Sequence, residues 1–186
     1  MTILVTGGCG YIGSHMVHAL ADAGEKVVVL DNLSTGFRTA LPEGIPLYIG
    51  NVGDEGLVCA ILGAHAVQSV IHFAASIVVP DSVRDPLFYY RNNTMNTRAL
   101  LESAVKSDVR HFIFSSTAAV YGNPEVMPVA EDAPTRPMSP YGASKLMSEI
   151  MLHDVVAAHE LKYVVAKSMN AAPFCMVTLR PSRSRP

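Results

Sequence analysis

The chain alternates short apolar runs with longer stretches in which apolar residues recur at helical spacing. The apolar runs predict buried β-strands at residues 3–5, 27–30, 47–49, 69–73, 111–114 and 163–166. The longer stretches predict helices over residues 11–23, 55–65, 86–107 and 141–159. Strands that alternate with helices are typical of a parallel sheet that is covered on both faces. We therefore predict an α/β fold with a doubly wound parallel sheet.

The composition indicates one folded domain rather than a disordered or membrane-spanning chain. The 186 residues are 49% hydrophobic and 16% charged, a balance that excludes disorder. No apolar run approaches the roughly 18 residues that span a bilayer, and the N-terminus lacks the basic start of a signal peptide. The net charge of −2 gives no reason to expect a nucleic-acid partner. We therefore expect neither a membrane nor nucleic acid among the partners.

The cysteines and histidines predict neither a disulfide framework nor a metal site. Cys9, Cys59 and Cys175 are widely spaced, and there is no CxxC pair. This usage is typical of a reducing compartment, so we expect a cytoplasmic protein. His15 and His18 lie three residues apart on a predicted helix, but no third ligand is near them in the sequence.

Glycines join the first predicted strand to the first predicted helix. Gly7, Gly10 and Gly13 form a GxxGxxG pattern. Glycine is needed where the backbone turns sharply and approaches a pyrophosphate, and the start of the following helix offers free N–H groups to phosphates. In this strand–turn–helix setting the pattern predicts a dinucleotide site of the Rossmann fold, although glycines also serve ordinary tight turns.

An acidic residue at the end of the second predicted strand indicates which dinucleotide binds. Asp31 follows Gly13 by 18 residues. A carboxylate at this place accepts hydrogen bonds from a ribose and repels a 2′-phosphate, so it favours NAD over NADP. The alternative is that Asp31 only caps a turn with Asn32.

Tyr141 and Lys145 form a second pattern of chemical interest. Residues four apart lie on one face of a helix, so the phenol and the ammonium are neighbours. A phenol has an ordinary pKa of about 10, and a nearby ammonium favours the phenolate. The pair is therefore suited to act as a general base near neutral pH. The alternative is a surface tyrosine and lysine at a polar helix start.

Three hydroxyl residues follow the fifth predicted strand. Ligands of open α/β sheets bind beyond the carboxyl ends of the strands, so Ser115, Ser116 and Thr117 lie where chemistry is expected. One of them is placed to hydrogen-bond a substrate hydroxyl, the alternative being that they only satisfy backbone groups. The loop over residues 117–140 contains five of the 12 prolines and is long enough to be functional or mobile.

Five motifs in a fixed order give the chain a resemblance to a known family. They are TGGxGYIGSH, IHFAA, YYRNNTMNT, FIFSSTAAVYG and SPYGASK. Up to residue 165 the sequence resembles the UDP-glucose 4-epimerase (UDP-galactose 4-epimerase) family of the extended short-chain dehydrogenase/reductases. Related sugar-nucleotide dehydratases usually carry acidic residues where this chain has Ala118 and Ala119. The resemblance implies an NAD-binding Rossmann domain over residues 1–165, UDP-glucose and UDP-galactose as substrates, and a place in galactose metabolism.

The resemblance also implies roles for individual residues. Tyr141 matches the catalytic base, Lys145 its partner, and Thr117 a hydroxyl that contacts the substrate. The implied cofactor site comprises Tyr141 and Lys145 together with Gly7, Gly10, Tyr11, Ile12, Gly13, Asp31, Asn32, Asn51, Val52, Phe73, Ala74, Ala75 and Asn92. Asn51 departs from the family, which usually has aspartate there beside the adenine, although an amide can still bond the adenine amino group. Ile77 departs as well, since some members have lysine there.

The implied reaction inverts the 4-hydroxyl of the sugar. Tyr141 as phenolate takes the proton from this hydroxyl, with Thr117 between them, while NAD+ takes the hydride from C4. The 4-ketose turns about its link to the diphosphate, and the hydride returns to its other face. NAD is recycled without net redox change.

The resemblance stops abruptly after residue 165. The family reads close to LRYFNVAGADP where this chain reads AKSMNAAPFC, and only Asn170, matching a substrate asparagine, and Ala172 coincide. All 16 acidic residues precede residue 161, and five of the 14 basic residues follow it. We expect residues 166–186 to be an aberrant tail from an altered reading frame, the alternative being a short protein with a basic tail. With the family's C-terminal substrate domain missing, we expect NAD binding without efficient epimerisation.

Two other functions stay open at this point. One is another NAD-dependent sugar-nucleotide epimerase or decarboxylase, and the other is a non-catalytic NAD-binding module. The Tyr141/Lys145 pair argues against the second, because a binding module has no need of a tuned phenol. The resemblance further implies a homodimer through the long helices predicted at residues 86–107 and 141–159, although one chain could equally cover their apolar faces.

Overall fold

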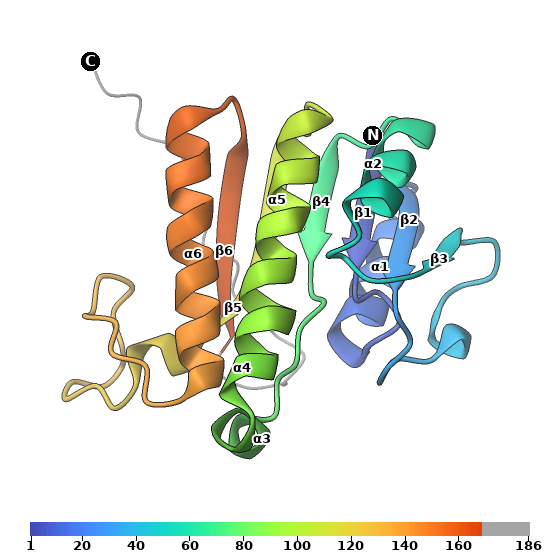
Figure 1. Cartoon of the computed structure of the whole chain (residues 1–186). Helices are drawn as coiled ribbons and strands as arrows, with labels where there is room; N and C mark the ends of the chain where they lie inside the picture. Colours follow the sequence, from blue (N-terminus) through green and yellow to red (C-terminus); the bar gives the residue numbers. More distant parts are fainter. Residues whose placement is uncertain (169–186) are drawn as a thin grey trace.

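Six parallel strands form one sheet in the computed structural model, which describes residues 1–168 (Figure 1). The strands are β1 (Thr2–Thr6), β2 (Lys26–Asp31), β3 (Leu47–Ile49), β4 (Ser69–His72), β5 (His111–Thr117) and β6 (Lys162–Ser168). Their order is β3-β2-β1-β4-β5-β6, so the progression of strands reverses between β1 and β4. This is the strand order of the Rossmann fold, and the predicted α/β class is confirmed.

The helices cover the two faces of the sheet unequally. One face carries α2 (Glu55–Ala64), α5 (Asn96–Lys106) and α6 (Pro140–Ala158), and the other carries α1 (Tyr11–Asp22). Side chains of a strand alternate between faces, so Leu4 of β1 points toward α2 while Ile3 and Val5 point toward α1. No described helix is long and apolar enough to cross a membrane.

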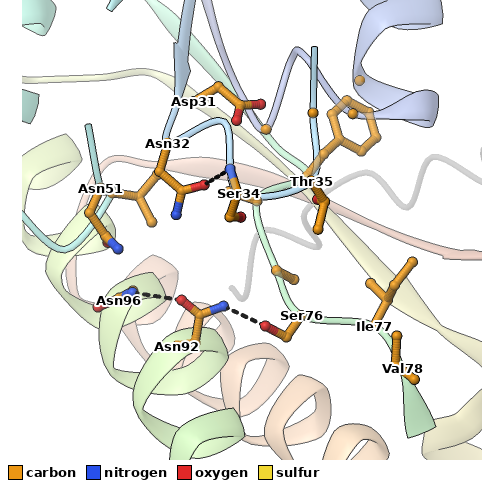
Figure 2. A pocket seen from close by; sticks show the side chains of 18 of the residues that line it. Asp31, Asn32, Ser34, Thr35, Asn51, Ser76, Ile77, Val78, Asn92 and Asn96 are labelled. Atoms are coloured by element: carbon orange, nitrogen blue, oxygen red, sulfur yellow. Dashed lines mark hydrogen bonds between the residues drawn. The ribbon is translucent and has the colours of Figure 1, made fainter. Parts of the chain in front are cut away.

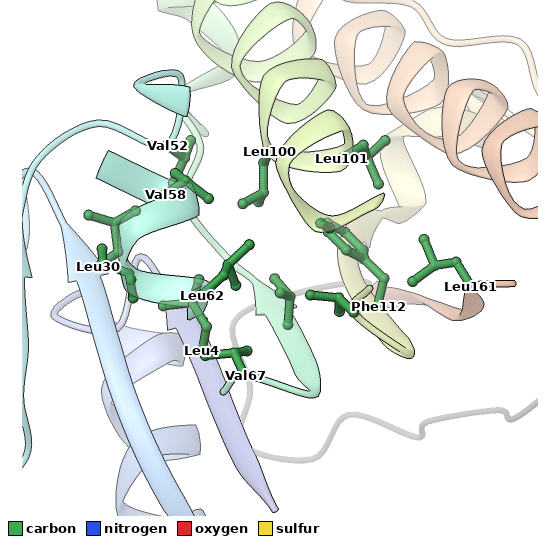
Figure 3. Packing of buried hydrophobic residues seen from close by; sticks show 14 of the residues in the cluster. Leu4, Leu30, Val52, Val58, Leu62, Val67, Leu100, Leu101, Phe112 and Leu161 are labelled. Atoms are coloured by element: carbon green, nitrogen blue, oxygen red, sulfur yellow. The ribbon is translucent and has the colours of Figure 1, made fainter. Parts of the chain in front are cut away.

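The larger hydrophobic cluster lies between the sheet and the helices α2, α5 and α6 (Figure 3). Leu4, Leu30 and Phe112 of the sheet pack there with Leu62 of α2 and Leu100 of α5, and all five are fully or almost fully buried. Burying one such side chain stabilises the fold by about 1.5–3 kcal/mol. The cluster therefore holds α5 and α6 at fixed positions over the sheet, and these helices carry residues of the candidate site.

The helix predicted over residues 86–107 is interrupted. The structure has α4 (Pro86–Tyr89), then a π-helical segment (Tyr90–Met95), then α5, and it adds an unpredicted α3 (Val79–Arg84) before them. A π-helix bonds each N–H to the carbonyl five residues back, which the spacing of apolar residues does not reveal. Such segments are frequent at functional sites, and this one contains the buried Asn93.

The last two strands are longer than predicted. β5 runs on through the three hydroxyl residues to Thr117, and β6 pairs with it as far as Ser168. Short 3₁₀ turns at Arg38–Ala40 and Ala118–Tyr121 lie where loops were expected. Asn170, the expected substrate residue, lies outside the described residues.

Candidate functional site

An open cavity of about 570 Å³ lies beyond the carboxyl ends of β1, β2, β3 and β4, where the strand order reverses. Its volume is within the range of small-molecule and cofactor sites. The structure places thirteen of the expected cofactor residues in its wall, namely Gly7, Gly10, Tyr11, Ile12, Gly13, Asp31, Asn32, Asn51, Val52, Phe73, Ala74, Ala75 and Asn92. The remaining expected site residues that the structure describes, Tyr141, Lys145 and Thr117, lie outside this wall.

The backbone of the glycine loop is packed so closely that side chains would not fit at Gly7 and Gly13. A loop without side chains lets a pyrophosphate approach the backbone. Gly7 has a φ of +71°, and a Cβ at this position would lie 2.6 Å from the Ala74 nitrogen. A Cβ on Gly13 would lie 2.1 Å from the Gly7 oxygen, so the start of α1 packs directly on the loop. Tyr11 and Ile12 of the first helical turn are exposed and line the cavity. The N–H groups at the start of α1 therefore face open space suited to an anion.

Asp31 has the loop-fixing role that one interpretation of the sequence gave it, and the ribose-binding role stays a prediction. It is 7% exposed, and its carboxylate accepts hydrogen bonds from the backbone nitrogens of Cys9, at 2.9 Å, and Leu33, at 2.8 Å. These bonds fix the loop after β2 against the glycine loop. A carboxylate has about four lone-pair positions, so Asp31 retains acceptors for a ribose in the cavity that it lines.

Asparagines and a serine line the side of the cavity opposite β2 (Figure 2). The Asn92 nitrogen donates to Ser76 Oγ at 2.9 Å, and Asn92 Oδ1 accepts from the Asn96 nitrogen at 3.3 Å. Sequence reasoning missed Ser76 and Asn96, as it did Ser34 and Thr35 of the opposite wall. Each of them lies within four residues of an expected site residue, which is the signal that could have found them.

Tyr141 stands at the start of α6, next to the cavity. The helix is capped by Ser139, whose Oγ accepts from the Gly142 nitrogen at 3.2 Å, and Pro140 occupies the first helical position. The Tyr141 ring meets the ring of Tyr89 edge-on, with centroids 6.5 Å apart, and Tyr89 lines the cavity. Thr117, at the end of β5, lies close enough to the Tyr141 phenol to lower its pKa. The structure thus brings the expected base and the expected hydroxyl together.

Burial dominates the electrostatics of the Tyr141/Lys145 pair. It raises the pKa of Tyr141 above its ordinary value, and the hydrogen bond with Thr117 opposes this rise. Lys145 was expected to lower the pKa of the phenol, but this pKa is set by burial and by Thr117, with no resolved contribution from Lys145. The Lys145 ammonium is 4% exposed, donates to the Ser115 carbonyl at 2.8 Å and lies over the Phe114 ring at 4.9 Å. Burial lowers its pKa to about 8, against the opposing charge of Glu149.

A buried chain of hydrogen bonds joins β1 and β4 to α6 through the π-helical segment. His72 contacts Thr6 Oγ1 through Nδ1, at 2.6 Å, and Thr97 Oγ1 through Nε2, at 2.9 Å. Thr97 Oγ1 donates to the Asn93 carbonyl, and the Asn93 side-chain nitrogen donates to Ser144 Oγ at 3.0 Å. Burial lowers the pKa of His72 to about 3, so the imidazole is neutral. The chain fixes the helix turn that carries Tyr141 and Lys145.

A second polar cluster joins β5, β6 and α6 one helical turn beyond Lys145. Ser116 Oγ donates to Glu149 Oε1, and the Lys167 ammonium lies 3.3 Å from Glu149 Oε2. Lys167 also donates to the Tyr121 hydroxyl at 3.2 Å. Of the three hydroxyl residues after the predicted strand, Ser116 therefore has a structural partner, while Thr117 contacts Tyr141. The described residues hold no cluster of three or more His, Cys, Asp or Glu side chains suited to a metal ion.

A doubly wound sheet, a glycine cradle at its switch point and an acid at the end of β2 define a dinucleotide-binding α/β protein. The Tyr141/Lys145 pair adjoins this site, as a base serving a bound dinucleotide would. The NAD dependent epimerase/dehydratase family matches residues 3–172, and the chain belongs to this family.

Within this family, the chain is similar to several UDP-glucose 4-epimerases. The UDP-glucose 4-epimerase of Azospirillum brasilense is 54% identical over 170 residues, which are 91% of this chain and 49% of that protein. The crystal structure of UDP-glucose 4-epimerase from Brucella ovis in complex with NAD has a TM-score of 0.89 at 41% identity, and covers 91% of this chain and 52% of that one. The crystal structure of UDP-glucose 4-epimerase from Thermotoga maritima with UDP-glucose has a TM-score of 0.87 at 40% identity. The match covers 90% of this chain and 55% of that one. The chain spans about half the length of these relatives.

Proposed function

We propose that this chain carries the NAD-binding and catalytic part of a UDP-glucose 4-epimerase, which interconverts UDP-galactose and UDP-glucose. The observation that carries the proposal is the placement of Thr117 beside the Tyr141 phenol next to the dinucleotide cavity, with the buried Lys145 one helical turn away. The identity of 54% with a protein of this activity supports it. We assign the NAD-binding domain to residues 1–165.

The residues around the cavity fit NAD. The Gly7–Gly13 loop and the start of α1 would hold the pyrophosphate, and Asp31 would accept a hydrogen bond from the adenosine ribose. The same carboxylate would repel a 2′-phosphate, which favours NAD over NADP. When bound, NAD+ supplies hydride transfer at C4 of the sugar.

The chain's own side chains would move the proton of the sugar 4-hydroxyl. Thr117 Oγ1 bridges this hydroxyl to the Tyr141 phenolate, which accepts the proton. Because burial raises the pKa of the phenol, the phenolate needs a positive charge close by. The Lys145 ammonium provides one from the same face of α6, held in place by the Ser115 carbonyl.

A chimera tests the proposed catalysis. Residues 1–165 are joined to the remaining half of the Azospirillum brasilense enzyme, and UDP-glucose formation from UDP-galactose is followed with a coupling dehydrogenase. We expect turnover that Tyr141→Phe reduces at least a hundredfold, because a general base contributes about 10²–10⁴-fold. A chimera that binds NAD+ but converts no sugar would identify a non-catalytic binding module. Equal conversion by the Tyr141→Phe chimera would show that Tyr141 is not the base.

We also propose a homodimer formed by α5 and α6. An apolar groove between these helices has Leu101, Val105, Met151 and Val155 in its wall, with charged residues of both signs around them. Ile150 of α6 is 53% exposed, so an acidic residue fits there without disturbing the core. Light scattering should give a dimer for the wild type and for the control Met138→Glu, and a monomer for Ile150→Glu. A monomeric wild type would contradict the assignment.

We propose the cytoplasm as the site of action and galactose metabolism as the context. The wide spacing of the cysteines supports a reducing compartment, and both described cysteines, Cys9 and Cys59, are free. Cell fractionation with an antibody against the chain tests the location. Recovery in a membrane or secreted fraction would contradict it.

A further inference from the structure

Glu149 continues the face of α6 that carries Tyr141 and Lys145. The three residues are spaced four apart, so they lie along one side of the helix. The Lys145 ammonium donates to the Ser115 carbonyl at 2.8 Å, and Glu149 Oε1 accepts from the hydroxyl of the next residue, Ser116. The lysine of the proposed catalytic pair and this carboxylate are therefore held one helical turn apart against the same strand, β5.

The other oxygen of Glu149 faces Lys167 of β6, the strand that lies beside α6 in Figure 1. The Lys167 ammonium lies 3.3 Å from Glu149 Oε2, and the two side chains are 24% and 14% exposed, so water screens this ion pair only weakly. Lys167 is also held on its far side, because it donates to the Tyr121 hydroxyl at 3.2 Å and lies 4.5 Å from the centre of the Tyr121 ring. Both charges of the pair therefore have fixed positions.

Glu149 is the carboxylate that acts on the Lys145 ammonium. Burial lowers the pKa of Lys145 to about 8, and the charge of Glu149 opposes this fall. Two other titratable groups of the described residues face Lys145, and both are neutral near pH 7. They are His72 on β4, whose pKa is about 3, and the Tyr141 phenol, whose pKa burial raises. The charge of Lys145 thus depends on Glu149, and Lys167 partly neutralises the charge of Glu149.

A lysine whose pKa is close to neutral responds strongly to such a balance of charges. With a pKa of about 8, about nine in ten molecules carry the Lys145 ammonium at pH 7, and a fall of about 1 would leave about half. The proposed base needs this positive charge, because burial raises the pKa of the Tyr141 phenol. An ion pair one helical turn from Lys145 can therefore set how many molecules are ready for proton transfer.

We propose that Glu149 and Lys167 are positioning residues that set the charge of Lys145, with Glu149 favouring the ammonium and Lys167 limiting this effect. The proposal rests on the proposed function, since it assigns the two residues to the support of the proposed base. Neither residue lines the dinucleotide cavity, so the proposal can be tested without cofactor or substrate.

NMR titration of the 186-residue protein with isotope-labelled lysine measures the pKa of Lys145 directly. The chain has five lysines, and the signal of Lys145 is identified by its loss in Lys145→Met. Glu149→Gln should lower the pKa of Lys145 by at least about 0.5, because Lys167 is then an unopposed positive charge. Lys167→Met should raise it by at least about 0.5, because the Glu149 carboxylate then acts with its full charge.

Two controls separate charge from contact. Lys167→Arg keeps the positive charge and should keep the wild-type pKa of Lys145, so Lys167→Met and Lys167→Arg together still decide the question if Glu149→Gln does not fold. Glu160→Gln removes a carboxylate from an exposed residue beyond the C-terminal end of α6, and it should also leave this pKa unchanged.

A purely structural role of the ion pair predicts a different result. Both Glu149→Gln and Lys167→Met break the pair, which would admit water to Lys145 and move its pKa toward the ordinary 10.5 in both variants. Shifts in the same direction, or a shift smaller than about 0.5 in either variant, would overturn the proposal and leave the proposed function intact. If Tyr141→Phe does not slow the chimera, the proposed function fails, while a measured coupling between Glu149 and Lys145 still stands.

Discussion

Replacing Lys145 with methionine is expected to stabilise the fold while removing the buried positive charge of the site. Lys145 is 4% exposed, and burial lowers its pKa from the ordinary 10.5 to about 8. The folded protein therefore holds the ammonium less readily than the unfolded chain does. Methionine is unbranched, uncharged and adaptable, so it fills the same space beside Phe114.

The lowered pKa sets the size of the expected effect. One unit of pKa corresponds to about 1.4 kcal/mol, so the charged lysine costs the fold about 3 kcal/mol below pH 8. Loss of the bond to the Ser115 carbonyl offsets about 1 kcal/mol of this gain. The free energy of unfolding of Lys145→Met should therefore exceed that of the wild type by about 2 kcal/mol at neutral pH.

The sign of the pH dependence is fixed by the same pKa. Between pH 8 and 10.5 the unfolded state binds more protons than the folded state, so wild-type stability rises relative to the variant as pH rises through this range. Urea unfolding followed by circular dichroism, near neutral pH and at about pH 10, measures both differences. Groups such as Cys9 titrate equally in the two proteins and cancel. A variant that is less stable than the wild type by about 1 kcal/mol at neutral pH would contradict this prediction, because Lys145 would then stabilise the fold.

Two further predictions concern the elements that support the site. His72 has a pKa of about 3 in the folded protein, far below its ordinary value of 6.5. Between these two pH values its imidazole is protonated in the unfolded chain but neutral in the fold. The free energy of unfolding should therefore fall by about 1.4 kcal/mol per pH unit as pH drops below 6.5. Urea unfolding at several pH values should show this slope reduced in His72→Gln, and an unchanged slope would contradict a neutral buried imidazole. At Gly13 a Cβ would lie 2.1 Å from the Gly7 oxygen, so Gly13→Ala should displace the loop and weaken NAD+ binding at least tenfold in titration. Wild-type affinity in this variant would show that the loop does not hold the cofactor.

The strands and the dinucleotide cavity could be predicted from the sequence because their signals are local. The apolar runs mark the six strands, and the glycine pattern lies between the first strand and the first helix. Asp31 could be found in the same way, since it ends β2. In a parallel sheet the carboxyl ends of the strands meet at one edge, which is why residues far apart in the sequence line one cavity.

Features that depend on long-range partners could not be predicted. The π-helical segment places Asn93 between Ser76 and Ser144, and neither partner is visible in the spacing of apolar residues. The pKa of Tyr141 depends on burial, which the YxxxK pattern does not contain. Lys167 of β6 forms an ion pair with Glu149 of α6, a contact that exists only because these two elements pack together.

Titration of the 186-residue protein with NAD+ and NADP+ tests whether the cavity at the end of β1, β2, β3 and β4 is an NAD site. We expect one NAD+ to bind per chain, and NADP+ to bind at least tenfold more weakly because Asp31 repels the 2′-phosphate. If neither dinucleotide binds, or if NADP+ binds as tightly as NAD+, the assignment of this cavity to NAD is wrong.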